Sequence, residues 1–263
     1  MSSPIFKVDA FTERPFAGNP AGVCLLERRH SEAWMQGVAA EMNVAETAFL
    51  FPTDAGFELR WFTPTAEVAL CGHATLASAH VLWEEGVLRQ DAEARFETKS
   101  GLLTAIRERG SILLDFPSEP AAAAPPPSGL AEALGARFSF CGRNRMDYLV
   151  ELADDAAVRS VQPAPKSLLA ISARGVIVTA RSASDEFDFV SRFFAPSVGV
   201  DEDPVTGSAH CALAPYWSAK LGRTTLKGYQ ASRRGGVVKV RLERDRVRLI
   251  GKAVTVLRGT LVV

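Results

Sequence analysis

The 263-residue sequence predicts an α+β protein built from two similar halves. The length suits two hydrophobic cores of about 130 residues each better than a single core. Strand-like and helix-like segments alternate in the first third of the chain, and three short strand-like segments follow them. One stretch of the first half also matches a stretch of the second half in residue type and spacing. That match indicates an internal repeat.

The first half contains a clear helix signal between two strand-like regions. Ser31 is a good N-cap, an apolar stripe runs to Met42, and Asn43 suits the C-terminal end of a helix. The other expected elements are strands over Ile5–Phe11, Ala21–Leu26, Glu46–Phe51 and Phe57–Phe62, a helix over Gly72–Glu85 ended by Gly86, and an antiparallel meander over Arg95–Thr98, Leu102–Ile106 and Ser111–Phe116.

A proline- and alanine-rich segment, 117–127, has no helical or strand period and is typical of a linker. We therefore expect one domain over 1–117, completed by the last residues of the chain, and a second over 118–263. Little pattern is recognisable up to about residue 175. The second domain is expected to contain strands over Tyr148–Leu152, Val176–Ala180 and Phe187–Phe193, a helix over Gly207–Leu221, and further strands up to the C-terminus.

The composition is that of an ordinary globular protein and implies no electrostatic partner. Thirty basic residues balance thirty acidic ones, and 47% of residues are hydrophobic. We find neither the basic face of a nucleic-acid binder nor the cationic amphipathic helix of a membrane-surface protein. The expected partner is a small molecule, and neither nucleic acid nor a membrane is expected.

The N-terminal segment and the cysteines both favour a cytoplasmic protein. Charge appears at Lys7 and Asp9, so the first residues form neither a secretory nor a membrane-spanning segment. The four cysteines are widely scattered without a CxxC pair, which fits neither a zinc site nor a disulfide framework. We expect them to be reduced thiols.

The repeat is carried by a Phe-x-Pro segment that precedes a glycine-led helix. In the first half Phe62–Pro64 precedes Gly72–Ala74, and in the second half Phe194–Pro196 precedes Gly207–Ala209. An alanine, a tryptophan and a glycine then follow at similar distances in both halves. Chance recurrence of Phe-x-Pro before a helix of small residues is the alternative explanation.

Both glycine-led helices begin with residues that suit an anion. Unpaired N–H groups and the positive end of the helix dipole lie at Gly72 and His73, and again at Gly207 and Ser208. If the two starts faced each other across an interface, they would bind a carboxylate. Alternatively, the glycines only permit tight turns and Ser208 is an ordinary cap.

Four segments of the chain resemble the signature segments of the PhzF-like family, in the family's order. They are FKVDAFTERPFAGNPAGV (Phe6–Val23), NVAETAF (Asn43–Phe49), FTPTAEVALCGHAT (Phe62–Thr75) and DEDPVTGSAH (Asp201–His210). The resemblance extends from the first strand to the last strands.

This resemblance implies a diaminopimelate epimerase-like fold. Such a fold has two pseudo-symmetric domains, each with a mixed or antiparallel sheet wrapped around a central helix. Here the central helices would be Gly72–Glu85 and Gly207–Leu221. The family usually forms homodimers and uses neither a metal nor an organic cofactor. Its namesake reaction, in phenazine biosynthesis, isomerises trans-2,3-dihydro-3-hydroxyanthranilate by moving a proton from C3 to C1 of the ring.

The resemblance also implies roles for individual residues, in a cleft between the two domains. The glutamate of the NVAET segment, Glu46, would be the catalytic acid/base. His73 and Asp203 would be further catalytic residues in the cleft. The residues expected to bind the substrate carboxylate are Gly72, His73, Gly207 and Ser208.

The residue types suit these roles, although each also has an ordinary structural explanation. Glu46 precedes the apolar run Ala48–Phe51, and such surroundings should raise its pKa and let it take and return a proton near neutral pH. A carboxylate near His73 would orient or charge the imidazole. Alternatively, Glu46 is a solvated charge at a strand start, His73 is a local hydrogen-bonding group, and Asp203 belongs to a solvated acidic loop.

Two other functions remain open from the sequence. The same fold serves two-cysteine racemases and epimerases, and Cys71 occupies the first thiol position. The place before Gly207 has no cysteine, however, and Cys211 lies one helical turn inside the helix. Alternatively, the chain is a binding protein on the same scaffold, because a fold does not guarantee turnover.

No sequence motif indicates metal or nucleotide chemistry. HExxH is absent, as are GxGxxG and GxxxxGK[ST]. We therefore expect an isomerase that works with acid/base side chains alone, with no cofactor and no metal.

Overall fold

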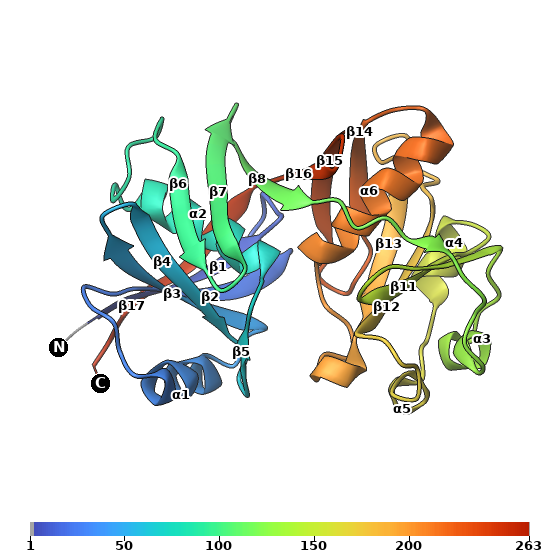
Figure 1. The fold of residues 1–263 in the computed structure, drawn as a ribbon, viewed down its shortest axis with the longest axis horizontal. Helices are drawn as coiled ribbons and strands as arrows, with labels where there is room; N and C mark the ends of the chain where they lie inside the picture. The colour runs from blue at the N-terminus through green and yellow to red at the C-terminus, as the bar shows by residue number, and fades with distance from the viewer. Residues whose placement is uncertain (1–2, 263) are drawn as a thin grey trace. The chain divides into compact units, whose positions relative to one another are not determined.

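The computed structural model describes residues 3–262 (Figure 1). The chain divides into two compact units. The first takes in the chain up to Phe116 and again from Ile250, and the second is Pro117–Leu249. The division falls one residue before the boundary expected from the sequence, and the last strand belongs to the first unit.

The first unit combines a twisted sheet with two helices. Its C-terminal strand β17, red in Figure 1, pairs antiparallel with the blue strand β1. The elements of this unit are β1 (Ser3–Ala10), β2 (Asn19–Leu25), α1 (Glu32–Met42), β3 (Glu46–Thr53), β4 (Gly56–Phe62), β5 (Glu67–Val68), α2 (Gly72–Glu84), β6 (Ala94–Thr98), β7 (Gly101–Glu108), β8 (Ser111–Pro117) and β17 (Ala253–Leu261).

The second unit has one long helix and several short ones. Its elements are β9 (Ala122–Ala123), α3 (Leu130–Leu134), β10 (Phe140–Arg143), β11 (Asp147–Glu151), α4 (Asp155–Ser160), α5 (Pro165–Leu168), β12 (Gly175–Arg181), β13 (Phe189–Phe194), the 3-10 turn η1 (Pro196–Val198), α6 (Gly207–Leu221), β14 (Thr225–Gln230), β15 (Gly236–Glu243) and β16 (Arg246–Gly251), whose last residues belong to the first unit.

The two units pair their strands in the same succession. In the first unit β1 and β2 are antiparallel, β2 and β3 parallel, β3 and β4 antiparallel, β4 and β6 parallel, and β6 and β7 antiparallel. The second unit repeats this succession with β10, β11, β12, β13, β14 and β15. The long helix stands at the same place in both, before the second parallel pairing. The strand pairing thus supports the internal repeat independently of the matching residues.

Helix α2 is buried along almost its whole length. Ten of its thirteen residues are buried, and several of these are alanine or serine, which let strands approach closely. A helix that is apolar on all sides is typical of a position inside a core. The buried hydroxyls bond within the helix: Thr75 donates to the Cys71 carbonyl and Ser78 to the Ala74 carbonyl. The first turn of α2 therefore lies inside the unit.

Helix α1 confirms the expected caps. The Ser31 side chain accepts a hydrogen bond from the Trp34 N–H at 3.2 Å, and Asn43 takes the left-handed conformation at φ 46°. The following strand β3 begins only three residues later, at Glu46.

Helix α6 contains a proline whose missing hydrogen bond is replaced by the linker. Pro215 has no N–H to donate to the Cys211 carbonyl four residues earlier. The Glu119 N–H, from the segment that follows β8, donates to that carbonyl at 3.0 Å instead. The proline therefore creates the acceptor that attaches the linker to the helix.

The linker differs from the sequence expectation in one respect. Ala122 and Ala123 form a short strand paired with β10, although 117–127 was expected to hold no strand. Proline-stiffened backbone is already extended, so a pair of alanines can join an edge without a periodic pattern. The weakly patterned region that follows contains α3, α4 and α5, each of six residues or fewer and too short to show a helical period.

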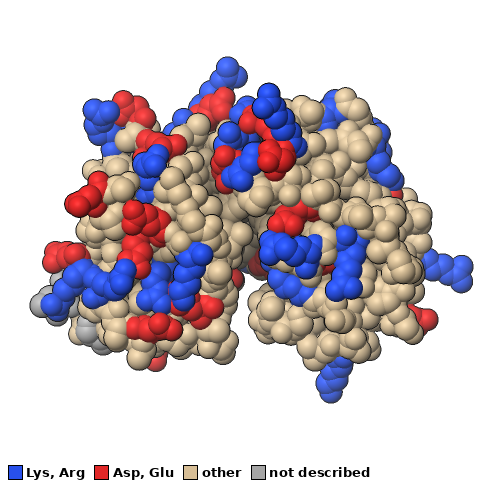
Figure 2. Space-filling model, in the orientation of Figure 1, with Lys and Arg blue, Asp and Glu red and all other residues tan. Residues whose placement is uncertain are grey.

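Charged side chains of both signs are interspersed on the face drawn in Figure 2. Many charged side chains of the described residues form ion pairs, as Arg60 does with Glu67 and Arg192 with Glu202. None of the helices in residues 3–262 is long and apolar enough to cross a membrane.

Replacing Glu119 by proline should destabilise the protein through Cys211. Compared with Glu119→Ala, which keeps the N–H, Glu119→Pro leaves the Cys211 carbonyl without its donor, and we expect a further loss of about 1–3 kcal/mol in the free energy of unfolding. Pro215→Ala restores the N–H within the helix, so the difference between the two variants should shrink in that background. Denaturant unfolding measures all four proteins. If the two Glu119 variants differ in stability by the same amount with and without Pro215→Ala, the cost of proline at position 119 does not come from the bond to the Cys211 carbonyl.

Candidate active site

Four side chains of the first unit meet at the start of helix α2. Asn19 is the first residue of β2, Glu46 is the first of β3, and Cys71 and His73 flank the first residue of α2. The two imidazole nitrogens of His73 face different neighbours. Nδ1 lies 3.2 Å from Asn19 Nδ2 and 3.5 Å from Cys71 Sγ, and Nε2 lies 3.2 Å from Glu46 Oε2.

Burial decreases across this cluster toward the glutamate. Asn19 is fully buried, the side chain of His73 is 5% exposed, and that of Glu46 is 19% exposed. The parallel pairing of β2 and β3 places Glu46 opposite Ala21, two residues beyond Asn19. Of His73 and Glu46, Glu46 is therefore the residue that solvent or a small molecule can reach.

Burial keeps His73 neutral. Desolvation lowers the pKa of His73 to about 3, so the ring carries one proton at neutral pH. A neutral imidazole has one donor and one acceptor nitrogen. The Asn19 amide presents its Nδ2 group to Nδ1, and because this group donates, Nδ1 accepts and the proton is assigned to Nε2.

The Nε2 proton is directed toward the side of Glu46. At 3.2 Å the pair is close, yet Nε2 has no partner of good hydrogen-bond geometry among residues 3–262. Hydrogen bonds of catalytic groups are often loose before substrate binds. The arrangement is thus a carboxylate next to a neutral N–H donor, and either group could contact a ligand.

Glu46, Cys71 and His73 also offer potential metal-ligand atoms within 4.8 Å of one another, although the sequence showed no metal-ligand spacing. The imidazole lies between the other two, with the thiol near Nδ1 and the carboxylate near Nε2. A metal ion takes one nitrogen of a histidine and requires ligand atoms about 3–4 Å apart. This geometry favours a hydrogen-bonded cluster over a three-ligand metal site, and we assign no metal to it.

The equivalent position of the second unit holds no carboxylate. Thr47 pairs with Phe62 and Val176 pairs with Phe194, so the repeat places Gly175 where the first unit has Glu46. A Cβ at Gly175 would lie 2.5 Å from the Phe193 ring. Among the described residues, the carboxylate of Glu46 therefore has no counterpart at this position of the second unit.

An arginine stands beside that glycine. Arg174 donates through Nε and Nη2 to the buried carboxylate of Asp147, and Nη2 also lies 3.0 Å from Ser208 Oγ. Ser208 is the second residue of α6, as His73 is of α2. Where the first unit has a carboxylate at its helix start, the second has a guanidinium and a hydroxyl, which suit an anion.

The remaining predicted residues lie in the second unit. Asp203 precedes α6, and its carboxylate accepts a hydrogen bond from the Thr206 hydroxyl at 2.5 Å. Gln230 holds the same turn by donating to the Asp203 carbonyl and accepting from the Thr206 N–H. The structure thus groups Glu46 with His73 in one unit, and Asp203 with the start of α6 in the other.

Asn19, Asp147 and Arg174 were missed as site residues by the sequence analysis. Asn19 lies within the first signature segment, between the two strands expected over Ile5–Phe11 and Ala21–Leu26. Aligning the two halves of the sequence on Phe62 and Phe194 sets Arg174 opposite Met42, and only the strand register of the structure sets it opposite Ala45. Nothing in the local pattern of the sequence distinguishes Asp147.

The family model for phenazine biosynthesis-like proteins matches residues 8–259. The chain belongs to the PhzF-like family. It is 53% identical over 262 residues to an uncharacterised isomerase of Halalkalibacterium halodurans and 46% identical over 263 residues to one of Pseudomonas aeruginosa, with 99% of each chain covered. These relatives confirm the expected isomerase.

Solved structures confirm the expected fold class. A PhzF-family protein of Enterococcus faecalis matches with a TM-score of 0.95 and 40% identity over all of both chains. A hydroxyproline epimerase of Agrobacterium vitis matches at a TM-score of 0.63 and 13% identity, over 99% of this chain and 92% of the other, which shows the fold alone.

Changing Asn19 to aspartate should move the proton of His73. A carboxylate accepts hydrogen bonds, so Nδ1 would carry the proton, Nε2 would lose it, and the pKa of His73 would rise. ¹⁵N NMR of the imidazole distinguishes the two tautomers. We expect protonated Nε2 in the wild type and protonated Nδ1 in Asn19→Asp, with Asn19→Ala as the variant that removes the donor. Protonated Nδ1 in the wild type would show that Asn19 does not set the tautomer.

Proposed function

We propose that this PhzF-like isomerase moves a proton within a small carboxylate substrate, with Glu46 as the only acid/base group and no metal or organic cofactor. The observation that carries the proposal is the partly exposed Glu46 carboxylate beside the buried, neutral His73, 3.2 Å away. A trans-2,3-dihydro-3-hydroxyanthranilate-like compound is the proposed substrate type.

One carboxyl group is enough for such a reaction. The Glu46 carboxylate takes a proton from one carbon of the substrate, the C–H electron pair shifts through the adjacent double bond, and the resulting carboxylic acid returns the proton to another carbon. No proton is gained or lost overall. His73 Nε2–H can donate to Glu46 or to a substrate oxygen, and because His73 is neutral it neither competes for the proton nor holds the carboxylate in a full ion pair.

The helix starts are the proposed carboxylate-binding groups. In the second unit, Gly207 and Ser208 begin a fifteen-residue helix, and Ser208 Oγ accepts from Arg174, which leaves the hydroxyl proton for a ligand. In the first unit, Gly72 and His73 offer the equivalent N–H groups. We propose that Asp203 acts by holding the turn into α6 through Thr206. That both units serve one site, and that the protein is a homodimer, stay predictions.

Deuterium exchange tests Glu46 directly. Candidate cyclic and amino-acid-like carboxylates are incubated with the protein in D2O, and deuterium incorporation is followed by NMR. We expect exchange in the wild type and a loss of about 100-fold or more in Glu46→Gln. The control is Glu97→Gln, an exposed glutamate of β6 that should exchange as the wild type does. The mechanism is wrong if Glu46→Gln exchanges normally or if no candidate acquires deuterium. Tight binding without exchange, unaffected by Glu46→Gln, would instead indicate a binding protein.

The two-thiol alternative predicts that the reaction depends on Cys71. The second thiol it needs is poorly placed, since Cys211 is buried within α6 and its pKa is raised to about 12 by burial. We expect Cys71→Ala to keep most of the deuterium exchange. Loss of exchange in Cys71→Ala, together with substrate protection of Cys71 from a thiol reagent, would favour paired thiols.

A further inference from the structure

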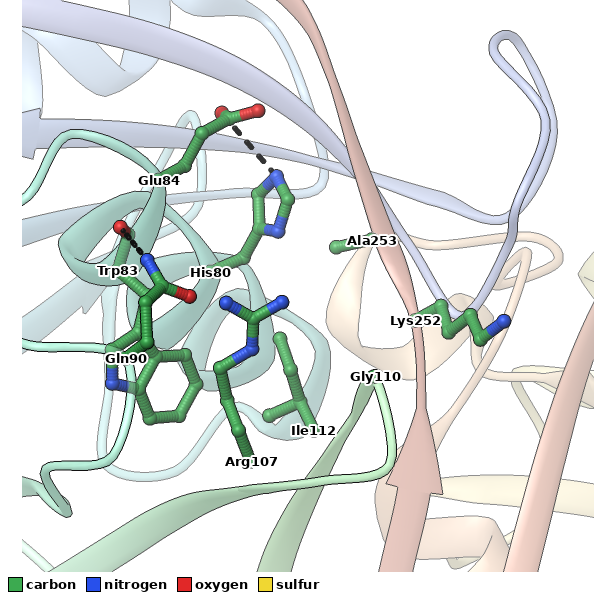
Figure 3. A pocket seen from close by; sticks show the side chains of 9 residues that line it. All are labelled: His80, Trp83, Glu84, Gln90, Arg107, Gly110, Ile112, Lys252 and Ala253. Atoms are coloured by element: carbon green, nitrogen blue, oxygen red, sulfur yellow. Dashed lines mark hydrogen bonds and ion pairs between the residues drawn. The ribbon is translucent and has the colours of Figure 1, made fainter.

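The first unit contains a cavity of about 380 Å³ at the C-terminal end of α2 (Figure 3). Its walls come from the last turns of α2, the β7–β8 hairpin and the start of β17. His80, in its wall, follows His73 by seven residues, which is about 10 Å along a helix. None of the lining residues belongs to the Glu46 cluster. This cavity is therefore separate from the candidate active site.

Arg107 supplies a positive charge to the cavity that no carboxylate neutralises. Its guanidinium lies among the lining side chains in Figure 3 and approaches the Trp83 ring, with Cζ 5.9 Å from the centroid. None of the described carboxylates, in residues 3–262, forms an ion pair with it. The acidic group of the wall, Glu84, is already paired with Arg258 at 2.9 Å, and Lys252 is paired with Glu13.

His80 presents an acceptor nitrogen to the same space. The Thr255 hydroxyl donates to Glu84 Oε2 at 2.5 Å, so its oxygen accepts from His80 Nε2, 3.2 Å away. The proton of neutral His80 therefore lies on Nε2. Nδ1, on the other edge of the ring, carries a lone pair that can accept a hydrogen bond. Figure 3 shows that this nitrogen points toward the Arg107 guanidinium.

Burial favours the neutral form of His80. Burial lowers its pKa, and Arg107 on β7 and Arg258 on β17 lower it further, while Glu84 and Glu85 oppose the shift. A ligand that approaches both Arg107 and His80 must therefore offer an anionic oxygen to the first and a hydrogen-bond donor to the second. Trp83 and Ile112 give the cavity an apolar wall.

We propose that this cavity is a binding site for a small oxyanion that also carries an O–H group, with the anionic oxygen on Arg107 and the O–H donating to His80 Nδ1. Monoprotonated and diprotonated phosphate and small hydroxycarboxylates share this chemistry. Acetate has the anionic oxygen without the neighbouring donor. The proposal does not depend on the function proposed for Glu46.

Titration of the full-length protein with inorganic phosphate, glycolate and acetate, at constant ionic strength, tests the site. The readouts are calorimetry and the NMR shift of His80. We expect phosphate and glycolate to bind and to shift the His80 signal, and acetate to bind about fivefold more weakly because it lacks one hydrogen bond. Equal binding of acetate and glycolate would overturn the role of His80, and no binding of phosphate or glycolate would overturn the site.

Two arginine variants separate the site from general surface charge. Arg107→Gln should abolish binding. Arg109→Gln makes the same charge change in the same hairpin, but Arg109 does not line the cavity, so this variant should still bind. Neither should alter deuterium exchange at Glu46. Phosphate binding that survives Arg107→Gln, or that is lost equally in Arg109→Gln, would contradict the proposal.

Discussion

The burial of helix α2 determines the chemistry at its first turn. The sheet of the first unit covers this helix along almost its whole length, so His73 is excluded from water as soon as the unit folds. An imidazole without water cannot easily carry a charge, and the pKa of His73 falls to about 3. A neutral ring then needs one donor and one acceptor as neighbours, and Asn19 and Glu46 are placed accordingly.

The two units of the internal repeat share a backbone arrangement but carry different side chains at equivalent positions. Equivalent positions hold Glu46 and Gly175, and His73 and Ser208, and packing accounts for the first of these differences. At Gly175 the Phe193 ring fills the space that a side chain would need. The duplicated helix start thus lies beside a carboxylate in one unit and beside an arginine in the other. A single carboxyl group suits isomerisation, whereas racemisation by paired thiols would need a second cysteine.

Hydrogen bonds between residues far apart in the sequence help to hold each unit together. Pro215 breaks the bonding pattern of α6, and Glu119 of the linker completes it. Thr255 of the last strand bonds to Glu84 of α2, although 171 residues separate them. Such contacts explain why the first unit must include the C-terminal strand.

The sequence by itself determined much of the fold, because its signals are local. The Ser31 and Asn43 caps, the glycine starts at Gly72 and Gly207 and the alternating strands depend on a few neighbouring residues, and the repeat could be recognised from spacing alone. Glu46 and His73 followed from the family resemblance. Only the tertiary structure decided how these residues act. Asn19 and His73 are 54 positions apart, and Arg174 and Ser208 are 34 apart. Their contacts, and the burial that sets the protonation of His73, arise when the sheet closes around the helix.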